Sequence, residues 1–530
     1  MKNKIIYVIP IILSSFFLHS CFDLTEEVFD QLDGDKLLNN LTDRDIVSVT
    51  AQMYSDMRVL YAGFDAHKTG CWFYTSEETA DIQITPRRGG AWYDGGVFER
   101  LNGHVWTVDD ELVLGPWQQF YKSINNCNRL LYLFEDSTLN INQEIREATL
   151  AEARTARAFW YYCLIDFYGN VPLVTTFDVP KGFLPETTPR DSVFRFCVNE
   201  LNSSINLLRE DGYGKWNKYA GLHLLARLYL NSEAWTGNPE WDKTDSICKI
   251  IMDSKKYKLE ADYKSVFVTE NQYSPEIILA IPNDEIYHSS NPFLPHLWSF
   301  HWKTYSHLMT ETKYWGGMCG EPAFINSYHN EDLRKAKSWL WGQQYDNLGA
   351  FGRKGDPLLC EGWRPEDAGL PLDYQNTFTK NSQGVGEQEG YRMFKYEVKP
   401  GAKPCLSNDF VLFRYADVYF MRAEALWRKN GKNATAMVTS LLNEVRKRAF
   451  ADYRGDKVLL STQLNDERFL AEYGWEFCQE GHRRQQLIRF DVFTTKKWMD
   501  HGSGEPYRKL FPIPYKERLA NPNLIQNDGY

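Results

Sequence analysis

Two arginines, two aromatic residues and an aspartate stand close to two pairs of glycines near residue 90. In RRGGAWYDGG, residues 87–96, the side chains of Arg87, Arg88, Trp92, Tyr93 and Asp94 follow one another closely. An aromatic ring can stack on the apolar C–H face of a sugar while arginine and carboxylate groups bind its hydroxyls. The glycines let a ligand approach the backbone. Two interpretations stay open: a carbohydrate-binding loop, or a loop that Trp92 and Tyr93 anchor to the fold.

Patterns for catalysis are few. Glu78 and Asp81 in ETAD provide two carboxylates, as a glycosidase requires, but paired acids are frequent in a chain with 70 Asp and Glu residues. The sequence has no GxSxG elbow, no HExxH pair and no Walker loop. GVGEQEG, residues 384–390, misses the dinucleotide-binding spacing by one residue. We therefore expect no enzyme activity, no catalytic residues, no cofactor and no metal site.

The N-terminus has the features of an export signal. Lys2 and Lys4 precede an apolar run over residues 5–18, which is shorter than the roughly 20 residues that a membrane-spanning helix needs. The run ends in Leu-His-Ser-Cys, which is similar to a bacterial lipobox. We expect residues 1–20 to be a lipoprotein signal peptide and Cys21 to become the acylated first residue of a mature domain over residues 21–530.

Charge argues against some partners. Without residues 1–20 the chain has 58 basic and 70 acidic residues, a net charge of −12. A nucleic-acid-binding protein would present a basic face, and electrostatic attachment to anionic lipids also needs basic residues. We expect no nucleic-acid partner, and attachment to a membrane through the acyl chains of Cys21.

Several segments repeat apolar residues at helical spacing. Residues 117–134 carry one such stripe, and residues 146–169 carry a second that ends at a glycine. Further helices are expected over residues 187–208, 219–235 and 239–254, and over a pair within residues 409–450. Alanines recur at Ala226, Ala416 and Ala423, where helices would approach closely. The sequence predicts a mostly α fold, a tetratricopeptide-like solenoid of helix pairs.

Two regions do not fit the helical pattern. Residues 84–106 and the long stretch 283–408 are rich in glycine and aromatic residues, so we expect loop-rich insertions with short strands and helices of their own. Residues 274–282 predict a strand. The nine cysteines after Cys21 show no metal-binding spacing, and we expect most of them to be buried small hydrophobic residues, with a disulfide bridge or two left open.

Seven segments together resemble the SusD/RagB family of outer-membrane nutrient-binding lipoproteins. The resemblance runs nearly from end to end of the chain. The matching segments are LHSC at 18–21, WQQFYKSINNCNRLL at 117–131, AEARTARAFWYYCLIDFYGNVPLV at 151–174, FVLFRYADVYFMRAEAL at 410–426, LLNEVRKRAF at 441–450, ERFLAEYGWEFCQEGHRRQQLIRF at 467–490 and FPIPYKERLANPNLIQNDGY at 511–530. The family often has Glu where this chain has Asp417, and Asp-Leu where it has Gln485 and Gln486.

The resemblance implies a function and a location. It implies a lipid-anchored protein, exposed at the surface of the outer membrane, that captures glycans and passes them to a SusC-like TonB-dependent transporter. It further implies that aromatic residues on loops bind the ligand. The residues that match this pattern are Arg87, Arg88, Trp92, Tyr93 and Asp94, and more loosely Trp302, Tyr305 and Trp315.

Three other functions remain open at this stage. The same fold could capture peptides, as some RagB-like members imply. A helical-repeat glycosidase would use Glu78, and a structural adhesin would bind no soluble ligand. The sequence names neither the glycan nor its linkage.

Overall fold

The structure is a computed structural model of the chain. It describes residues 43–61, 70–136, 141–287, 299–301, 315–345, 355–379, 382–399, 403, 406–499 and 501–530. The predictions for the leader 1–20, for Cys21, and for Trp302 and Tyr305 lie outside the described residues.

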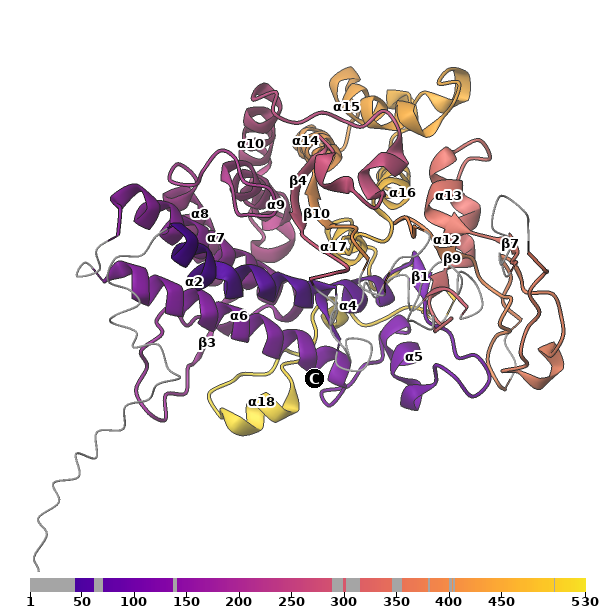
Figure 1. Cartoon of the computed structure of the whole chain (residues 1–530), viewed down its shortest axis with the longest axis horizontal. Helices are drawn as coiled ribbons and strands as arrows, with labels where there is room; N and C mark the ends of the chain where they lie inside the picture. Colours follow the sequence, from indigo (N-terminus) through magenta and orange to yellow (C-terminus); the bar gives the residue numbers. More distant parts are fainter. Residues whose placement is uncertain are drawn as a thin grey trace, which may run out of the picture.

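Helices that pack in sequence order form the main layer of the fold (Figure 1). Each helix contacts the next one along the chain, and α10 contacts α14 across the long insertion. The helices of this layer are α6 (Glu111–Glu135), α7 (Gln143–Tyr168), α8 (Arg190–Ser204), α9 (Lys218–Thr236), α10 (Trp241–Asp253), α14 (Tyr415–Lys429) and α15 (Ala436–Arg446). The predicted mostly α fold of helix pairs is confirmed.

Local sequence explains where these helices begin and which face they bury. The side chain of Asn142 accepts hydrogen bonds from two backbone amides at the start of α7, and Asn217 does the same for α9. Gly237 ends α9 in the left-handed conformation. Both predicted apolar stripes are buried, and the rings of Phe120 in α6 and Trp160 in α7 meet with centroids 5.8 Å apart.

A two-stranded ladder marks the base of the long insertion. The strand predicted over residues 274–282 is present as β4 (Ile277–Ile281), and it pairs antiparallel with β10 (Phe410–Arg414). Phe410 lies opposite Ile281, and both strands are buried along their whole length. The chain therefore leaves the helical layer after β4 and returns to it beside the same strand.

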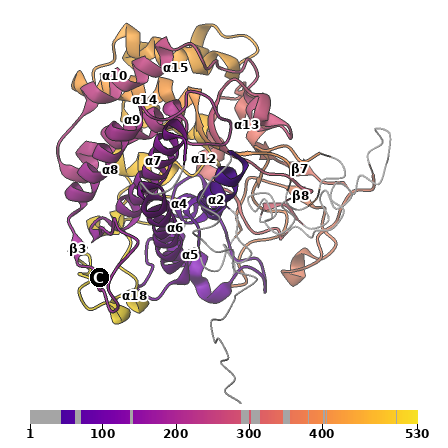
Figure 2. The same ribbon diagram turned by 60° about the vertical axis from the view of Figure 1, so that its left-hand side comes forward.

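The described part of the insertion is built from short elements. They are β5 (Cys319–Gly320), α12 (Pro322–Ser327), α13 (Leu333–Ser338), β6 (Trp339–Leu340), β7 (Gly342–Gln343), β8 (Asp373–Tyr374) and β9 (Arg392–Met393). β5 pairs with β1 (Gln83–Ile84), so the insertion is joined to the N-terminal loop region. Figure 2 shows β7 and β8 on the side of the molecule away from α8 and α9.

The remaining elements lie at the two ends of the chain. In the N-terminal part these are α2 (Asp43–Ser55), α4 (Trp72–Glu78), α5 (Val97–Asn102), β2 (Val171–Pro172) and β3 (Thr187–Thr188). In the C-terminal part they are α16 (Asp466–Phe477), α17 (Arg483–Arg489) and α18 (Tyr515–Ala520). α17 contacts α4, which closes the first and last parts of the chain on each other.

A buried network of ion pairs joins β4, β10 and α16. Glu476 accepts from Arg414 at 2.9 Å, from Arg448 at 2.6 Å and from Arg334 at 3.1 Å. Glu276 accepts from Arg414 and Arg448 as well. Burial by itself would raise the pKa of Glu476, but the three guanidinium groups lower it far below its usual range. The network fixes the base of the insertion on the helical layer.

Eight cysteines lie within the described ranges of the chain. There, Cys71, Cys127, Cys163, Cys197, Cys248, Cys319, Cys360 and Cys478 are all buried and unbridged. Within the same ranges, no helix is both long enough and apolar enough to cross a bilayer.

Candidate functional site

The loop over residues 87–96 lies between β1 and α5, next to the insertion (Figure 1). Arg88 and Ala91 exchange two backbone hydrogen bonds, at 3.0 and 2.9 Å, which turn the chain back on itself. Beyond this turn the backbone of Trp92 and Asp94 has positive φ, at 60° and 41°. This conformation costs a residue with a side chain about 1 kcal/mol or more. The surrounding contacts therefore have to hold the loop in place.

Two neighbouring arginines in this loop have opposite environments. Arg88 is fully buried and donates to the carbonyl oxygens of Gly317 and Gly386 and to the sulfur of Cys319. Its guanidinium therefore holds the loop from beneath and has no access to solvent. Arg87 is only half buried, and its guanidinium lies 5.0 Å from the centre of the Tyr93 ring. A ligand at the surface could reach Arg87 but not the side chain of Arg88.

Three aromatic side chains gather at the outer side of the loop. The indole nitrogen of Trp92 donates to the carbonyl oxygen of Trp315 at 2.7 Å, and the two indole rings lie 6.3 Å apart. Trp92 also contacts Phe98 of α5, with centroids 5.7 Å apart. Tyr93 is 48% exposed and Trp315 is 36% exposed. These rings come from two segments that are far apart in the sequence, and together they form a surface on which the apolar face of a ligand can stack.

Asp94 adds an acidic group to this surface. Its side chain is exposed beside Tyr93, at the tip of the same loop. The predicted residues Arg87, Trp92, Tyr93, Asp94 and Trp315 thus come together at one place, which we call the aromatic loop site. Whether each of them contacts a ligand stays a prediction.

The Trp92 ring packs directly against the backbone of Gly317. A Cβ atom on Gly317 would lie 2.3 Å from the Trp92 ring, so only glycine leaves room for it. Gly89 has φ of 60°, and a Cβ there would lie 1.8 Å from the carbonyl oxygen of Trp363. Segments 87–92, 315–317 and 361–364 therefore press directly on one another.

Trp363 and Glu387 belong to the support of this site and were not predicted from the sequence. Trp363 is half buried, lies against Gly316 and contacts the His301 ring with centroids 5.3 Å apart. Glu387 accepts from the backbone amides of Gly362 and Trp363, at 2.7 and 2.6 Å. The carboxylate thereby fixes the segment that packs on the aromatic loop site.

Hydrogen bonding decides the protonation state of Glu387. Its second oxygen accepts from the amide of Glu361 at 2.9 Å and lies 3.0 Å from Nε2 of His301. Burial by itself would raise the pKa of Glu387, but these hydrogen bonds lower it to about 2. Glu387 stands in GVGEQEG, residues 384–390, where Glu389 accepts from the amide of Gly386 and the carbonyl oxygen of Gly386 accepts from Arg88.

The carboxylates of ETAD lie in the interior. Glu78 accepts from the amide and the hydroxyl of Thr85, both at 2.8 Å. Asp81 is paired with Arg483 and Lys496, and these cations lower its pKa despite burial. Both side chains are at most 2% exposed. Asp81 lines a hollow of about 570 Å³, but Arg483 and Lys496 bind its carboxylate oxygens. Within the described residues, no cluster of His, Cys, Asp or Glu could hold a metal ion.

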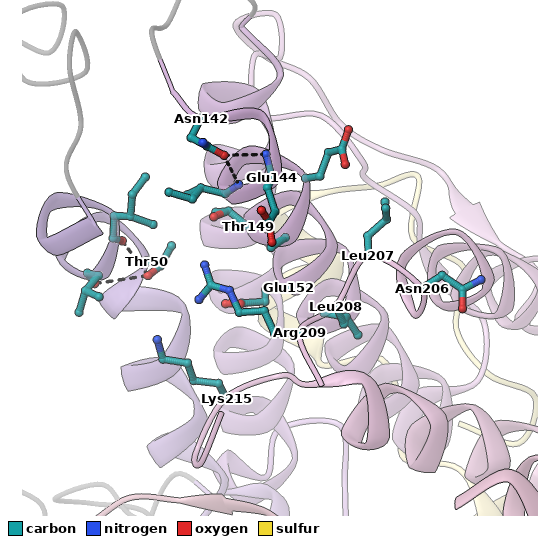
Figure 3. A pocket seen from close by; sticks show the side chains of 15 residues that line it. Thr50, Asn142, Glu144, Thr149, Glu152, Asn206, Leu207, Leu208, Arg209 and Lys215 are labelled. Atoms are coloured by element: carbon teal, nitrogen blue, oxygen red, sulfur yellow. Dashed lines mark hydrogen bonds between the residues drawn. The ribbon is translucent and has the colours of Figure 1, made fainter. Parts of the chain in front are cut away.

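A separate hollow of about 690 Å³ lies at the other end of the molecule, between α2, α7 and the connection from α8 to α9 (Figures 1 and 3). At its base Glu152 accepts from the hydroxyl of Tyr54 at 2.6 Å, and burial raises the pKa of Glu152. Figure 3 shows Arg209 beside Glu152 and Lys215 reaching into the hollow. Among the described residues that line it, none is aromatic, so they provide no stacking surface like that of the aromatic loop site.

Exposed aromatic residues on loops that a rigid helical layer supports are typical of ligand-binding proteins. Comparison with known proteins agrees with this class. The model of the SusD family matches residues 319–530, and a model described as "Starch-binding associating with outer membrane" matches residues 37–230. The chain belongs to the SusD/RagB family.

Individual relatives extend over most of the chain. It is 25% identical to the starch-binding protein SusD of Bacteroides thetaiotaomicron, over 92% of this chain and 90% of that protein. A SusD-like protein of Bacteroides ovatus is 24% identical over 76% of this chain and 74% of the relative. The first of these relatives is described as starch-binding, and together with the family models it supports association with the outer membrane.

Solved structures confirm the fold. A SusD superfamily protein from Parabacteroides distasonis has a TM-score of 0.71 at 19% identity, covering 93% of this chain and all of that one. The surface glycan-binding protein A of Bacteroides thetaiotaomicron, solved in complex with laminarihexaose, has a TM-score of 0.70 at 20% identity and covers 92% and 100%. At these identities the likeness establishes the shared fold.

Proposed function

We propose that this protein binds an oligo- or polysaccharide through the aromatic loop site and delivers it to a SusC-like TonB-dependent transporter of the outer membrane. The observation that carries the binding step is the cluster of Trp92, Tyr93 and Trp315, in which Tyr93 and Trp315 are exposed and the partly buried Trp92 ties the N-terminal loop to the insertion. Stacking needs rings that are fixed in orientation yet open to solvent, and this cluster meets both conditions.

Polar groups around the rings suit the hydroxyl groups of a sugar. Arg87 lies against Tyr93, and Asp94 is exposed next to it. A guanidinium donates and a carboxylate accepts, so the site offers both kinds of hydrogen bond. Trp302 and Tyr305 are further candidates in the insertion. Arg88 supports the loop and takes no direct part in this proposal, because its guanidinium is buried and already hydrogen-bonded.

The role is one of capture, without catalysis. The carboxylates of Glu78 and Asp81 are buried and bonded within the fold, and the relatives are described as glycan-binding or starch-binding proteins. Acylation of Cys21, after removal of residues 1–20, would hold the mature domain 21–530 at the membrane. A solenoid of helices presents broad surfaces, one of which would meet the transporter.

Titration of the soluble chain from Phe22 onward against a panel of polysaccharides tests the binding step. Trp92→Ala and Trp315→Ala should each weaken glycan binding at least about tenfold, because a truncated aromatic anchor removes most of its contact energy. Tyr273→Ala is the matched control, since Tyr273 is 79% exposed outside the site. Binding to peptides and to no glycan would favour the peptide-capturing alternative. Release of reducing ends by the purified protein would contradict a purely binding role.

Membrane attachment and delivery have their own tests. Cys21→Ala should release the protein from the membrane fraction, because stable anchoring depends on the acyl chains. Retention of the variant at the membrane would contradict the anchoring proposal. Co-purification of a TonB-dependent transporter with the wild-type protein, extracted in mild detergent, would support delivery, and its absence from such extracts would contradict it.

A further inference from the structure

A second exposed aromatic pair lies at the end of the β6–β9 ladder. In this antiparallel ladder Trp339 lies opposite Met393 and Leu340 opposite Arg392, so the next positions are Trp341 and Tyr391. Their rings are stacked, with centroids 5.3 Å apart and planes at 17°. The pair shares no residue with the aromatic loop site.

The pair continues a buried face of the ladder out to solvent. Side chains two positions apart in a strand point to the same face, so Trp341 follows Trp339, and Tyr391 precedes Met393 on the same side. Trp339 is 1% exposed, whereas Trp341 is 41% exposed. Packing against Tyr391 fixes the orientation of the Trp341 ring and leaves much of its surface open. If Trp341 served only to fill the core, we would expect its ring to be buried like that of Trp339.

Polar side chains surround this pair. The ammonium group of Lys335 lies 5.9 Å from the centre of the Tyr391 ring. On the other side, the β7–β8 pairing places Gly342 opposite Tyr374, so Gln375 follows beside Trp341. The Gln375 amide is exposed and donates to the carboxylate of Asp373 at 3.5 Å. An ammonium, an amide and a carboxylate thus border the two rings.

The carboxylate of Asp373 also acts on the Tyr391 hydroxyl. Burial raises the pKa of Tyr391, and the nearby charge of Asp373 raises it further. The hydroxyl therefore stays protonated at neutral pH and can donate a hydrogen bond to a ligand.

We propose that Trp341 and Tyr391, bordered by Lys335, Asp373 and Gln375, form a second carbohydrate-binding surface that stacks a pyranose ring on the outer face of Trp341. The ring provides the apolar face, while the ammonium, the amide and the carboxylate bind hydroxyl groups. This inference rests on the proposed glycan-binding function but on a different set of residues. Two such surfaces on one protein would bind a long chain more tightly than either alone, through a raised effective concentration.

Calorimetric titration with the polysaccharide that the wild-type protein binds tests this inference. Trp341→Ala should weaken binding of the polysaccharide at least about tenfold, as expected for loss of an aromatic anchor. Trp341→Phe keeps a ring and should retain most of the affinity. Tyr273→Ala serves again as the exposed aromatic control, and the thermal midpoint of each variant shows that it is folded. Residual binding by the double variant Trp92→Ala, Trp315→Ala should disappear when Trp341→Ala is added.

The outcomes separate the two proposals. Equal affinity of Trp341→Ala and wild type would overturn the second surface and leave the aromatic loop site standing. Weaker binding by Trp341→Ala together with unchanged binding by Trp92→Ala and Trp315→Ala would support the second surface and overturn the assignment of the first. A wild-type protein that binds no carbohydrate would overturn both.

Discussion

Glu387→Gln tests how the aromatic loop site is held. One Glu387 oxygen accepts from the amides of Gly362 and Trp363, and the other accepts from the amide of Glu361 and lies 3.0 Å from His301. A glutamine has one accepting oxygen, and its amide nitrogen only donates. In the variant, one or two of the three backbone amides of segment 361–363 therefore face an NH₂ group in place of an acceptor, and the segment loses part of its attachment.

Two related considerations give the magnitude. Hydrogen bonds to a charged group contribute about 1.5 to 3 kcal/mol each, so losing one or two costs about 1.5 to 6 kcal/mol. The lowering of the Glu387 pKa from 4.5 to about 2 corresponds to about 3 kcal/mol. We expect a local loss of about 3 kcal/mol, which is a factor of about a hundred in the opening equilibrium of segment 361–363.

The pH dependence follows from the sign of the shift. The pKa of Glu387 is lower in the folded protein, so its stabilisation is complete above pH 4.5 and is lost as the pH falls towards 2. Burial also lowers the pKa of His301, which adds a loss of stability as the pH falls below 6.5. The wild-type segment should therefore open in acid, and in Glu387→Gln the part between pH 4.5 and 2 should be absent.

Amide hydrogen exchange resolved to residues 361–363 measures this opening directly. At pH 7 these amides should exchange about a hundredfold faster in Glu387→Gln than in the wild type. Glycan affinity should fall as well, because Trp363 packs on Gly316, next to Trp315. Glu467→Gln is the control, since Glu467 is exposed on α16. Unchanged exchange in Glu387→Gln, with the acid-dependent opening intact, would refute the reasoning.

Three further predictions concern stability and packing. Burial raises the pKa of the Glu77 carboxyl to about 8, so this group must take up a proton on folding at pH 7. Glu77→Gln should therefore raise the free energy of unfolding in urea by about 1 to 3 kcal/mol, and this increase should fade below pH 4.5. Gly317→Ala should displace the Trp92 ring and weaken glycan binding at least about tenfold in titrations, with a similar thermal midpoint. Arg414→Met leaves buried carboxylates short of a cation and should cost about 3 to 5 kcal/mol in urea unfolding, whereas a loss below 1 kcal/mol would contradict the role of the network.

The helical layer could be predicted because its signals are local. The stripe from Phe120 to Phe134 and the stripe from Ala153 to Phe167 repeat every three or four residues, and both are buried in α6 and α7. The strand over residues 274–282 could also be read as a short apolar run. Its partner β10 could not, because the two strands are separated by the whole insertion and nothing in either names the other.

The candidate site was predictable only in composition. Arg87 and Arg88 are adjacent and chemically identical, yet one lies at the surface against Tyr93 and the other is buried beneath Gly317 and Gly386. The side chains of adjacent residues point in different directions, and only the segments packed around the loop decide which direction is solvent. Glu387 stands in GVGEQEG, but nothing in that segment predicted its role, because three of its partners are backbone amides, which every sequence contains.

By itself the sequence determined the helices, the strand at 274–282, the family and the residue types available for stacking on a sugar. Periodicity and helix caps act within a few residues, so they are written in consecutive letters. The tertiary structure alone decided that Trp92 and Trp315, 223 residues apart, share one surface, and that Trp341 and Tyr391 share another. These contacts depend on which distant segments pack together, and the total free energy of the folded chain determines that packing.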